Sequence, residues 1–394
     1  MYRVGFGDCF LLSLPDEDGT PAYVLVDCGV HSQGDIGTMD RIVDDLSKEC
    51  GGHLTLIIAT HAHQDHISGF ARRADVFKRL KVDEVWLPWT ENPKDPGARA
   101  VKQKQLALAE ALRMHFQAAG IRSDALFAVL NAAGNQAALD LLKAGVTGGT
   151  VQYLEAGKTL IQAAGIKELT VQVLGPPRDE KFLARMDPPT GDRFLKLGLN
   201  GKAVPSNVIE PFVGKWTAKE GSTSGLPTLR QDEKKALKAL LDSASRLAFS
   251  LDQAINNTSL VTLFSFRQKH LLLPGDAQYG NWQYWINTPE GESILEHIDF
   301  LKVAHHGSLN ATPKSALAKM PNKGFAAMLS TQNHPWPSIP FGKMLAVLNQ
   351  KATGVVRSDS IPITDAKEAP TGPKMTPMPG FTLGPFWCDY TLSV

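Results

Sequence analysis

This sequence has no large excess of positive or negative charge. Its 394 residues carry 41 basic and 40 acidic side chains, which leaves a formal net charge of +1. This balance excludes a strong global field that would hold nucleic acid or an anionic membrane. Any polyanionic substrate would therefore need a local basic patch.

Cysteine is scarce, and long apolar runs are absent. The four cysteines, Cys9, Cys28, Cys50 and Cys388, have no CxxC spacing, which favours small buried residues over disulfides or metal ligands. No run of about 18 apolar residues could span a membrane, and residues 1–8 lack the apolar core of a signal peptide. We therefore expect a soluble cytoplasmic protein with no membrane partner.

The most informative segment is the run of residues 60–66. Only 11 histidines occur in the chain, yet His61, His63 and His66 stand here with Asp65, directly after the apolar run 54–59. In an extended backbone His61 and His63 point the same way and can close on one ion. Asp65 and His66 remain for a second ion about 3.5–4 Å away. The alternative, a polar loop with incidental histidines, fits poorly with such a cluster.

Alternating apolar residues predict a mixed α/β chain, in one large domain or two smaller ones. Strands are expected at 9–14, 22–26, 54–60, 82–87, 169–174, 259–266, 269–273, 299–304, 326–330 and 354–357. Helices are expected at 38–48, 69–80, 97–144 with a break at Gly120, 231–255 and 341–350. The segment 60–66 thus follows a strand end, and a helix is expected to begin near Asp65.

Two insertions and a tail interrupt this pattern. Residues 97–145 read as a helical insertion, and residues 178–256 as a second one, irregular to about 230 and then helical. The irregular part is too long for an ordinary connection, so we expect it to face a substrate or a partner. Residues 362–394 form a tail that is rich in proline up to about residue 380.

Acidic and histidine side chains recur where predicted strands end. Besides the cluster at 61–66, these are Asp27, Asp276 and the adjacent pair His305 and His306. A pair of divalent ions needs imidazoles for each ion and one carboxylate that bridges them, and a Gly-Asp at a strand end supplies such a carboxylate.

These residues resemble the metallo-β-lactamase superfamily. Its His-x-His-x-Asp-His motif stands at 61–66, its bridging aspartate at Asp276, and its last histidine at His305 or His306. More narrowly, residues 4–8, 26–29, 257–261, 273–277 and 301–308 look like the hydrolase domain of competence DNA-uptake proteins of the ComEC type. The resemblance covers most of residues 1–360 and implies one domain over 1–394, a four-layer αββα sandwich with helical insertions. The family's membrane channel is absent, so DNA transport does not carry over.

The resemblance implies a binuclear centre, with Zn²⁺ expected ahead of Mn²⁺. His61, His63 and Asp276 would hold one ion, and Asp65, His66, Asp276 and the distal histidine the other. We favour His305 over His306 as that distal ligand because it directly ends the strand. The family's third histidine for the first ion has no clear counterpart, since only His115, in a helix, and His270, in a hairpin turn, lie in the interval. The first site is therefore expected to be weak or empty, or held by three protein ligands.

Metal-bound water would supply a hydroxide nucleophile at neutral pH. With a single ion, Asp65 is instead a candidate general base. Asp27 is expected to orient a ligand histidine, or else to cap its strand. His334 is a candidate proton donor or substrate ligand, with a plain turn residue as the alternative.

Phosphodiesters, either small molecules or nucleic acid, are the leading substrate class. A basic run could bind the phosphates, although a solvated helix face is the alternative; its members are Arg72, Arg73, Lys78, Arg79 and Lys81. Tryptophans near strand ends could stack on bases or pack in the core, namely Trp86, Trp89, Trp282, Trp285 and Trp336. Hydrolysis of carboxylic esters, thioesters, lactones or lactams is the second reading, and a non-catalytic metal-binding module the third. The oligomeric state stays open.

Overall fold

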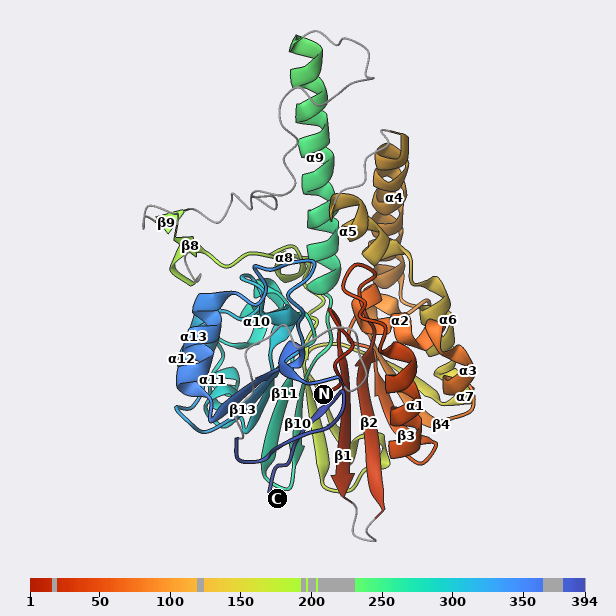
Figure 1. Ribbon diagram of the computed structural model, residues 1–394, viewed down its shortest axis with the longest axis vertical. Coiled ribbons are helices and arrows are strands. Elements are labelled where there is room, and N and C mark those ends of the chain that lie inside the picture. The colour runs from red at the N-terminus through yellow and green to blue at the C-terminus, as the bar shows by residue number, and fades with distance from the viewer. Residues whose placement is uncertain are drawn as a thin grey trace.

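Two β-sheets packed face to face, with helices on both outer sides, form the body of the protein (Figure 1). The computed structural model describes residues 1–15, 20–118, 124–192, 196–197, 203–204, 231–363 and 378–393. Short three-ten turns join several elements, at Trp89–Glu91, Ala163–Gly165, Thr190–Asp192, Ala304–Gly307 and Ser358–Ser360.

The first sheet has five strands in the order β1-β2-β3-β4-β5. They are β1 (Cys9–Pro15), β2 (Pro21–Cys28), β3 (His53–Ile58), β4 (Lys81–Pro88) and β5 (Thr150–Leu154). β1 pairs antiparallel with β2, whereas β2 to β5 are parallel. The carboxyl ends of β2 and β3 therefore meet at one edge of the sheet, where Asp27 and the 60–66 segment lie.

The second sheet has seven strands in the order β14-β13-β12-β11-β10-β7-β6. They are β6 (Lys158–Ile161), β7 (Leu169–Gly175), β10 (Val261–Phe266), β11 (Lys269–Leu273), β12 (Phe300–Lys302), β13 (Ala326–Leu329) and β14 (Gly354–Arg357). β11 to β14 are parallel, so Asp276 and the 305–306 pair follow neighbouring strand ends.

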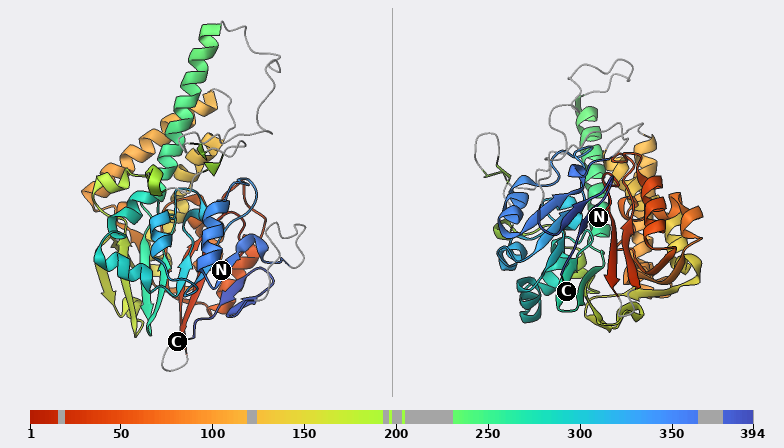
Figure 2. Two further views of the ribbon diagram at one scale, coloured as in Figure 1. Left: turned by 90° about the vertical axis from the view of Figure 1, so that its left-hand side faces the viewer. Right: turned by 60° about the horizontal axis from the view of Figure 1, so that its bottom comes forward.

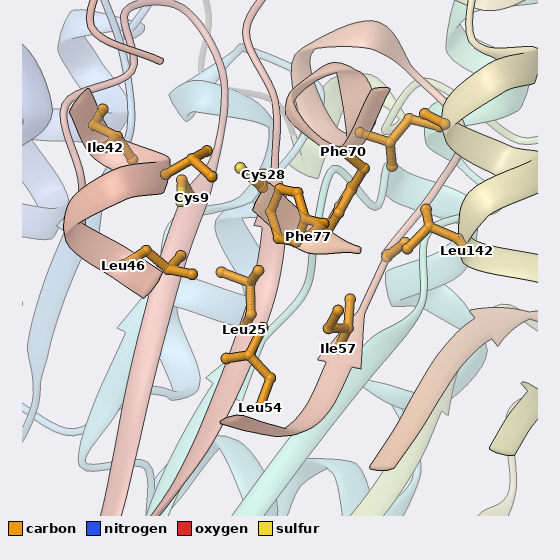
Figure 3. Packing of buried hydrophobic residues seen from close by; sticks show 14 of the residues in the cluster. Cys9, Leu25, Cys28, Ile42, Leu46, Leu54, Ile57, Phe70, Phe77 and Leu142 are labelled. Carbon is orange, nitrogen blue, oxygen red and sulfur yellow. The ribbon is translucent and has the colours of Figure 1, made fainter. Parts of the chain in front are cut away.

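Alternation along the strands divides the core into layers. In β3, Leu56 and Ile58 face the second sheet, whereas Ile57 faces the outer helices, because successive side chains point to opposite faces of a sheet. Figure 3 shows the outer layer of the first sheet, where Leu25 packs against α1 and Phe77. The four-layer αββα prediction is confirmed. All four cysteines are free and buried, as expected.

Helices cover both outer faces. The first sheet packs against α1 (Met39–Glu49), α2 (Gln64–Arg72), α3 (Ala74–Phe77) and α6 (Gln136–Lys143). The second packs against α10 (Tyr279–Trp285), α11 (Pro289–Glu296), α12 (Lys314–Lys319) and α13 (Gly342–Lys351). The sequence predicted α1 and α13 but not α10, α11 or α12, because these short helices carry too few turns for a clear apolar period.

A helical arm rises from the same end of the sandwich in both figures (Figure 1, Figure 2). It consists of α4 (Pro96–Ala118), α5 (Asp124–Ala133) and α9 (Gln231–Asn256), which share a small apolar core. α7 (Gly145–Gly148) follows α6 and leads into β5. By length and composition alone the run Asp124–Gly148 could cross a membrane, but 47% of its apolar window is buried inside the protein, and it is divided among three short helices.

The irregular segment and the tail are described only in part. Within 178–230 the described elements are α8 (Glu180–Leu183), β8 (Lys196–Leu197) and β9 (Ala203–Val204); the remaining expectation for 178–230 lies largely outside the described residues. Residues 364–377 of the tail also lie outside the described residues. Beyond it, β15 (Phe381–Leu383) and β16 (Cys388–Tyr390) form a hairpin, and the Cys388 N–H donates to the carbonyl of Met1.

Candidate metal centre

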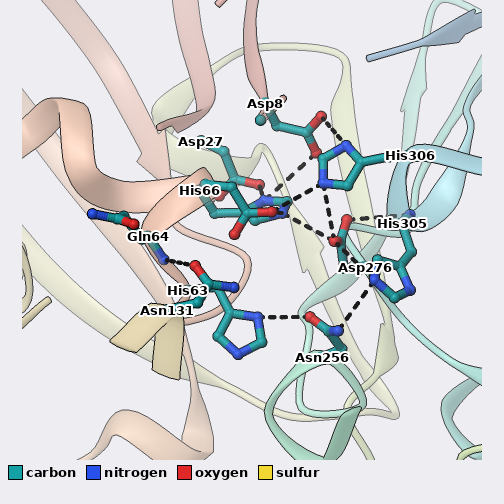
Figure 4. Close-up of polar contacts among 12 residues, drawn as sticks. Asp8, Asp27, His63, Gln64, His66, Asn131, Asn256, Asp276, His305 and His306 are labelled. Carbon is teal, nitrogen blue, oxygen red and sulfur yellow. Dashed lines mark hydrogen bonds and ion pairs between the residues drawn. The ribbon is translucent and has the colours of Figure 1, made fainter. Parts of the chain in front are cut away.

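Four buried side chains from both sheets converge at the strand ends. They are Asp65, His66, Asp276 and His306, called the quartet below, and one ligand atom from each lies within 4.8 Å of all the others. His306 Nε2 lies 3.1 Å from Asp65 Oδ2 and 3.4 Å from Asp276 Oδ2, and His66 Nε2 lies 3.1 Å from the same Asp276 oxygen. Figure 4 shows His66, Asp276 and His306 turned toward one point.

The first turn of α2 delivers two members of the quartet. α2 begins at Gln64, so Asp65 and His66 lie in its first turn, where the helix dipole favours a carboxylate. The backbone of this turn passes close to Gly29, where an added Cβ would stand 2.5 Å from the backbone nitrogen of His66. Glycine is thus required at position 29 to let α2 approach the end of β2.

Hydrogen bonds orient both imidazoles of the quartet. Asp27 Oδ2 lies 2.7 Å from His66 Nδ1 and also accepts a hydrogen bond from the Thr60 hydroxyl. His306 Nδ1 lies 3.0 Å from the carbonyl oxygen of Ser330. Because these acceptors place the proton on Nδ1, Nε2 of each ring points into the quartet with its lone pair. Asp27 therefore lies beside His66, a candidate ligand of the quartet.

The quartet fits a divalent cation. Among the described residues, Asp65 Oδ1 and His66 Nε2 are buried without a hydrogen-bond partner, which is unusual for buried polar atoms. Two carboxylates and two imidazoles are ligand types that both Zn²⁺ and Mn²⁺ accept.

Carboxylates control the protonation of the quartet when no cation is bound. Burial by itself would lower the pKa of His66, but Asp276, Asp27, Asp65 and Asp8 together raise the pKa well above its usual value. The pKa of His306 is also raised, because Asp276 and Asp65 outweigh its burial. Without a cation both rings are therefore shifted toward the form with a second proton on Nε2, and the Nε2 lone pair becomes available once a cation displaces that proton.

Metal uptake should consequently release protons. Since the pKa values of His66 and His306 are raised, we expect the apparent metal affinity to increase as the pH rises through neutrality. Titration calorimetry in two buffers of different ionisation enthalpy measures the number of protons released. Equal heats in both buffers would contradict this assignment of protonation states.

The geometry favours His306 over His305 and reverses the preference drawn from the sequence. Both residues adopt left-handed backbone conformations, with φ of 46° and 52°, so the chain turns sharply and the two rings point apart. His305 Nε2 lies 4.0 Å from Asp276 Oδ2 and 3.3 Å from Asn256 Nδ2. His305 is therefore adjacent to the quartet but outside it.

The two histidines should respond differently to substitution. His306→Ala should weaken metal binding more than about 100-fold, beyond the loss typical of a residue that only orients a ligand. His305→Ala should weaken binding by about tenfold or less, because it removes only a neighbour. Metal competition with a chromogenic chelator measures both variants, and the reverse order would restore His305 as the ligand.

The first histidine pair lies beside the quartet. His61 Nε2 is 3.0 Å from His63 Nδ1, and the ring centroid of His61 lies 4.1 Å from that of His66, with the two rings tilted. Burial lowers the pKa of His61 well below its usual value and that of His63 to about 4, so both imidazoles are neutral. Neither His115 nor His270 joins them, since His270 lies at the opposite end of β11 against Ser265 and His115 is on α4.

Sequence reasoning missed two charged residues under the quartet, Asp8 and Lys302. Lys302 Nζ forms an ion pair with Asp8, lies 3.4 Å from Asp276 Oδ1, and donates to the carbonyl of Gly275 at 3.0 Å. A lysine inside the predicted strand 299–304 was the available signal. Asp8, Asp27 and His66 also form a group that could hold an ion, but Lys302 already neutralises Asp8.

Other expected residues lie away from the quartet. His334 is exposed, and its Nδ1 lies 3.3 Å from the carbonyl of Gln33; among the described residues it has no hydrogen bond or ion pair with the quartet. His31, which the sequence did not suggest, is buried, and its ring centroid lies 4.7 Å from that of Trp336 and 6.5 Å from that of Phe6.

The basic run does not form a free patch. Arg72 pairs with Asp35, and Arg73 with three aspartates, at 40, 44 and 75. Arg79 and Lys81 also pair with neighbouring carboxylates. The alternative reading, a solvated helix face, describes these residues better. Of the five tryptophans, Trp86, Trp89, Trp282 and Trp285 are buried, and Trp336 is half-buried against Phe6.

Comparison with known proteins finds only distant structural similarity. No protein-family model and no curated protein matches the sequence. Among solved structures, the metallo-β-lactamase fold protein YhfI from Bacillus subtilis is similar at 10% identity, over 90% of this chain and 94% of that chain, with a TM-score of 0.36. Zn²⁺-bound PqqB from Methylobacterium extorquens is similar at 10% identity, over 87% and 83%, with a TM-score of 0.34. Likeness this low carries no conclusion about activity, so the αββα assignment rests on the sheets and cores of this chain.

Proposed function

We propose that this protein is a metal-dependent hydrolase whose reaction centre is the quartet. The observation that carries the proposal is the convergence of Asp65, His66, Asp276 and His306, all buried, from segments that follow β3, β11 and β12. A divalent cation bound there would act as a Lewis acid on the substrate and lower the pKa of water toward neutrality.

The residues around the quartet prepare it for this role. Asp27 and the Ser330 carbonyl hold His66 and His306 with Nε2 inward, which avoids a reorganisation cost when a ligand binds. Lys302 lies on the far side of Asp276 and offsets part of the negative charge of Asp276 and Asp8. Asp65 has one oxygen without a hydrogen bond, which could accept a proton from a nucleophilic water.

We place phosphodiesters first among the substrates. The quartet and the adjacent pair of His61 and His63 could hold two cations side by side, and two adjacent cations suit the attacking and leaving oxygens of phosphodiester hydrolysis. Because Arg72, Arg73 and Arg79 are already ion-paired, the helix face gives little support for a long nucleic acid. A small phosphodiester is therefore proposed ahead of DNA or RNA.

Two aromatic side chains near the quartet, Phe6 and Trp336, favour a second candidate function. This is the hydrolysis of a carboxylic ester, thioester, lactone or lactam. The ring of Phe6 lies 4.3 Å from that of His306 and 4.6 Å from that of Trp336. Uncharged aromatic side chains next to the quartet would suit the apolar part of a neutral substrate.

A substrate panel separates these candidates. Protein purified with chelator and reloaded with Mn²⁺ or Zn²⁺ would be assayed on bis-p-nitrophenyl phosphate, labelled single-stranded DNA, p-nitrophenyl acetate and a small lactone. Turnover of the phosphodiester above the ester supports the first proposal, and the opposite order supports the second. Metal-loaded protein inert on all four would contradict a hydrolase function.

A further inference from the structure

Three ligand-type atoms meet beside the quartet. His61 Nε2 lies 3.0 Å from His63 Nδ1, and His63 Nδ1 lies 2.7 Å from Asn256 Oδ1. All three side chains are buried, at 2%, 1% and 1% exposure. Asn256 is the last residue of α9, so the helical arm supplies one of the three atoms.

The orientation of the Asn256 amide follows from its second contact. Asn256 Nδ2 lies 3.3 Å from His305 Nε2, and His305 Nδ1 is 2.9 Å from the hydroxyl of Ser308. Because the amide NH₂ can only donate, its natural acceptor is the ring nitrogen of His305. The carbonyl oxygen Oδ1 is therefore turned toward His63, as Figure 4 shows.

The outer nitrogens of the two imidazoles face groups that can hold their protons. His61 Nδ1 lies 3.2 Å from the hydroxyl of Ser259, which already accepts a hydrogen bond from the backbone N–H of Asp276. Asp252 Oδ1, one turn before Asn256 on α9, lies 3.5 Å from His63 Nε2. Without a cation, His63 Nδ1–H donates to the Asn256 oxygen; with a cation bound, this proton would lie on Nε2 beside Asp252 and the three inner atoms would present only lone pairs. Three lone pairs so close together repel one another unless a proton or a cation lies among them.

We propose that His61, His63 and Asn256 form a second divalent-cation site, in which the amide oxygen of Asn256 replaces a third imidazole. The inference rests on the proposed function, since it places this cation next to the one in the quartet. The expectation of a weak or empty first site came from the lack of a third histidine, and Asn256 fills that position from an insertion helix.

The ligand types determine the metal preference of this site. An amide oxygen is a harder ligand than an imidazole, so two imidazoles and one amide oxygen favour Mn²⁺ over Zn²⁺ relative to a site of three imidazoles. The site is thus assigned to a divalent cation that accepts mixed nitrogen and oxygen ligands.

The arm is fastened to the metal-binding segment, which keeps Asn256 in place. Asn135 Nδ2 donates to the carbonyl of Ala62 at 2.7 Å, and the backbone N–H of Gln64 donates to Asn131 Oδ1 at 2.9 Å. Asn131 also lies 3.4 Å from Asp252. α5 and α9 therefore hold the 61–66 segment and Asn256 in one framework.

Metal stoichiometry tests the site without using activity. Wild-type protein, freed of metal and titrated with Mn²⁺, should bind two equivalents. Asn256→Ala should lose affinity for one equivalent by about 100-fold or more, whereas Asn256→Asp and Asn256→His should keep two. Asn256→His should also raise the preference for Zn²⁺ over Mn²⁺ at that equivalent by about tenfold or more. The matched control Gln117→Ala, an exposed amide on α4 of the same arm that accepts a hydrogen bond from Arg113, should keep two equivalents.

Several results would overturn the site. They are a wild type that binds one equivalent, an Asn256→Ala variant that keeps two at unchanged affinity, and Asp and His variants that each bind only one. If Asn256→Ala does not fold, an unchanged metal preference in Asn256→His would overturn the site as well. The proposed function fails separately, because it fails only when protein with its full metal content hydrolyses no substrate of the panel.

Discussion

Asp276→Asn should abolish tight metal binding at the quartet and lower kcat/KM by about a thousandfold or more. Asp276 Oδ2 is the oxygen that His66 and His306 share, at 3.1 and 3.4 Å. Asparagine keeps the shape of the side chain but removes the charge that a cation would bind. A loss of about 4 kcal/mol in transition-state stabilisation, the scale expected when Lewis-acid catalysis is lost, corresponds to this factor.

The matched control for this variant is Asp299→Asn. Asp299 precedes β12 at the far end from the quartet, where it accepts a hydrogen bond from the backbone N–H of His270. It should retain both metal content and turnover. Elemental analysis and steady-state kinetics measure the two variants, and an Asp276→Asn protein with wild-type metal content would refute the assigned role.

Lys302→Met should lower the free energy of unfolding by about 3–5 kcal/mol in the presence of chelator. The ammonium group is 1% exposed and pairs with Asp8 and Asp276, which are equally buried. Removal of the lysine leaves two buried carboxylates without their cation, and one broken buried ion pair costs about this much. Denaturant unfolding with a fixed excess of chelator measures the change.

A second substitution identifies the cause. The double variant Lys302→Met, Asp8→Asn also removes one of the two carboxylates that Lys302 pairs with. It should recover part of the lost free energy of unfolding. Lys319→Met, which breaks the partly exposed pair with Glu292, should cost less than about 1 kcal/mol. Equal losses of unfolding free energy in Lys302→Met and Lys319→Met would show that the buried ion pair stabilises the fold no more than the partly exposed one.

Strand ends were the predictable part of this molecule. Apolar runs such as 54–59 are long enough to mark buried parallel strands, and acidic or histidine residues directly after them must lie at one edge of a sheet. That reasoning identified Asp27, the 61–66 segment and Asp276, which the structure brings together. It needed only local sequence and the rule that carboxyl ends of parallel strands share an edge.

Contacts that depend on exact backbone geometry were not predictable. His305 and His306 are adjacent in sequence, and only their left-handed conformations decide which ring enters the quartet. Asn256 approaches His63 across 193 residues, and it lies in a helix whose apolar pattern says nothing about its last residue. Lys302 is unusual as a lysine in an apolar run, but only the fold brings Asp8 beside it.

The basic run shows how a single sequence leaves two readings open. Charges that cluster in sequence between 72 and 81 suggested a phosphate-binding face, but aspartates from α1 and from the 35–40 segment lie against them. A single sequence gives the positions of like charges along a helix, and it does not give the opposite charges that a neighbouring helix brings.

Anomalous diffraction from crystals soaked in Mn²⁺ tests the central claim most directly. We expect a strong peak among Asp65, His66, Asp276 and His306, separate from the peak of the second site, and the loss of this quartet peak in Asp276→Asn crystals of the same form. A well-ordered quartet with no peak at saturating Mn²⁺ or Zn²⁺ would contradict a metal centre at this position.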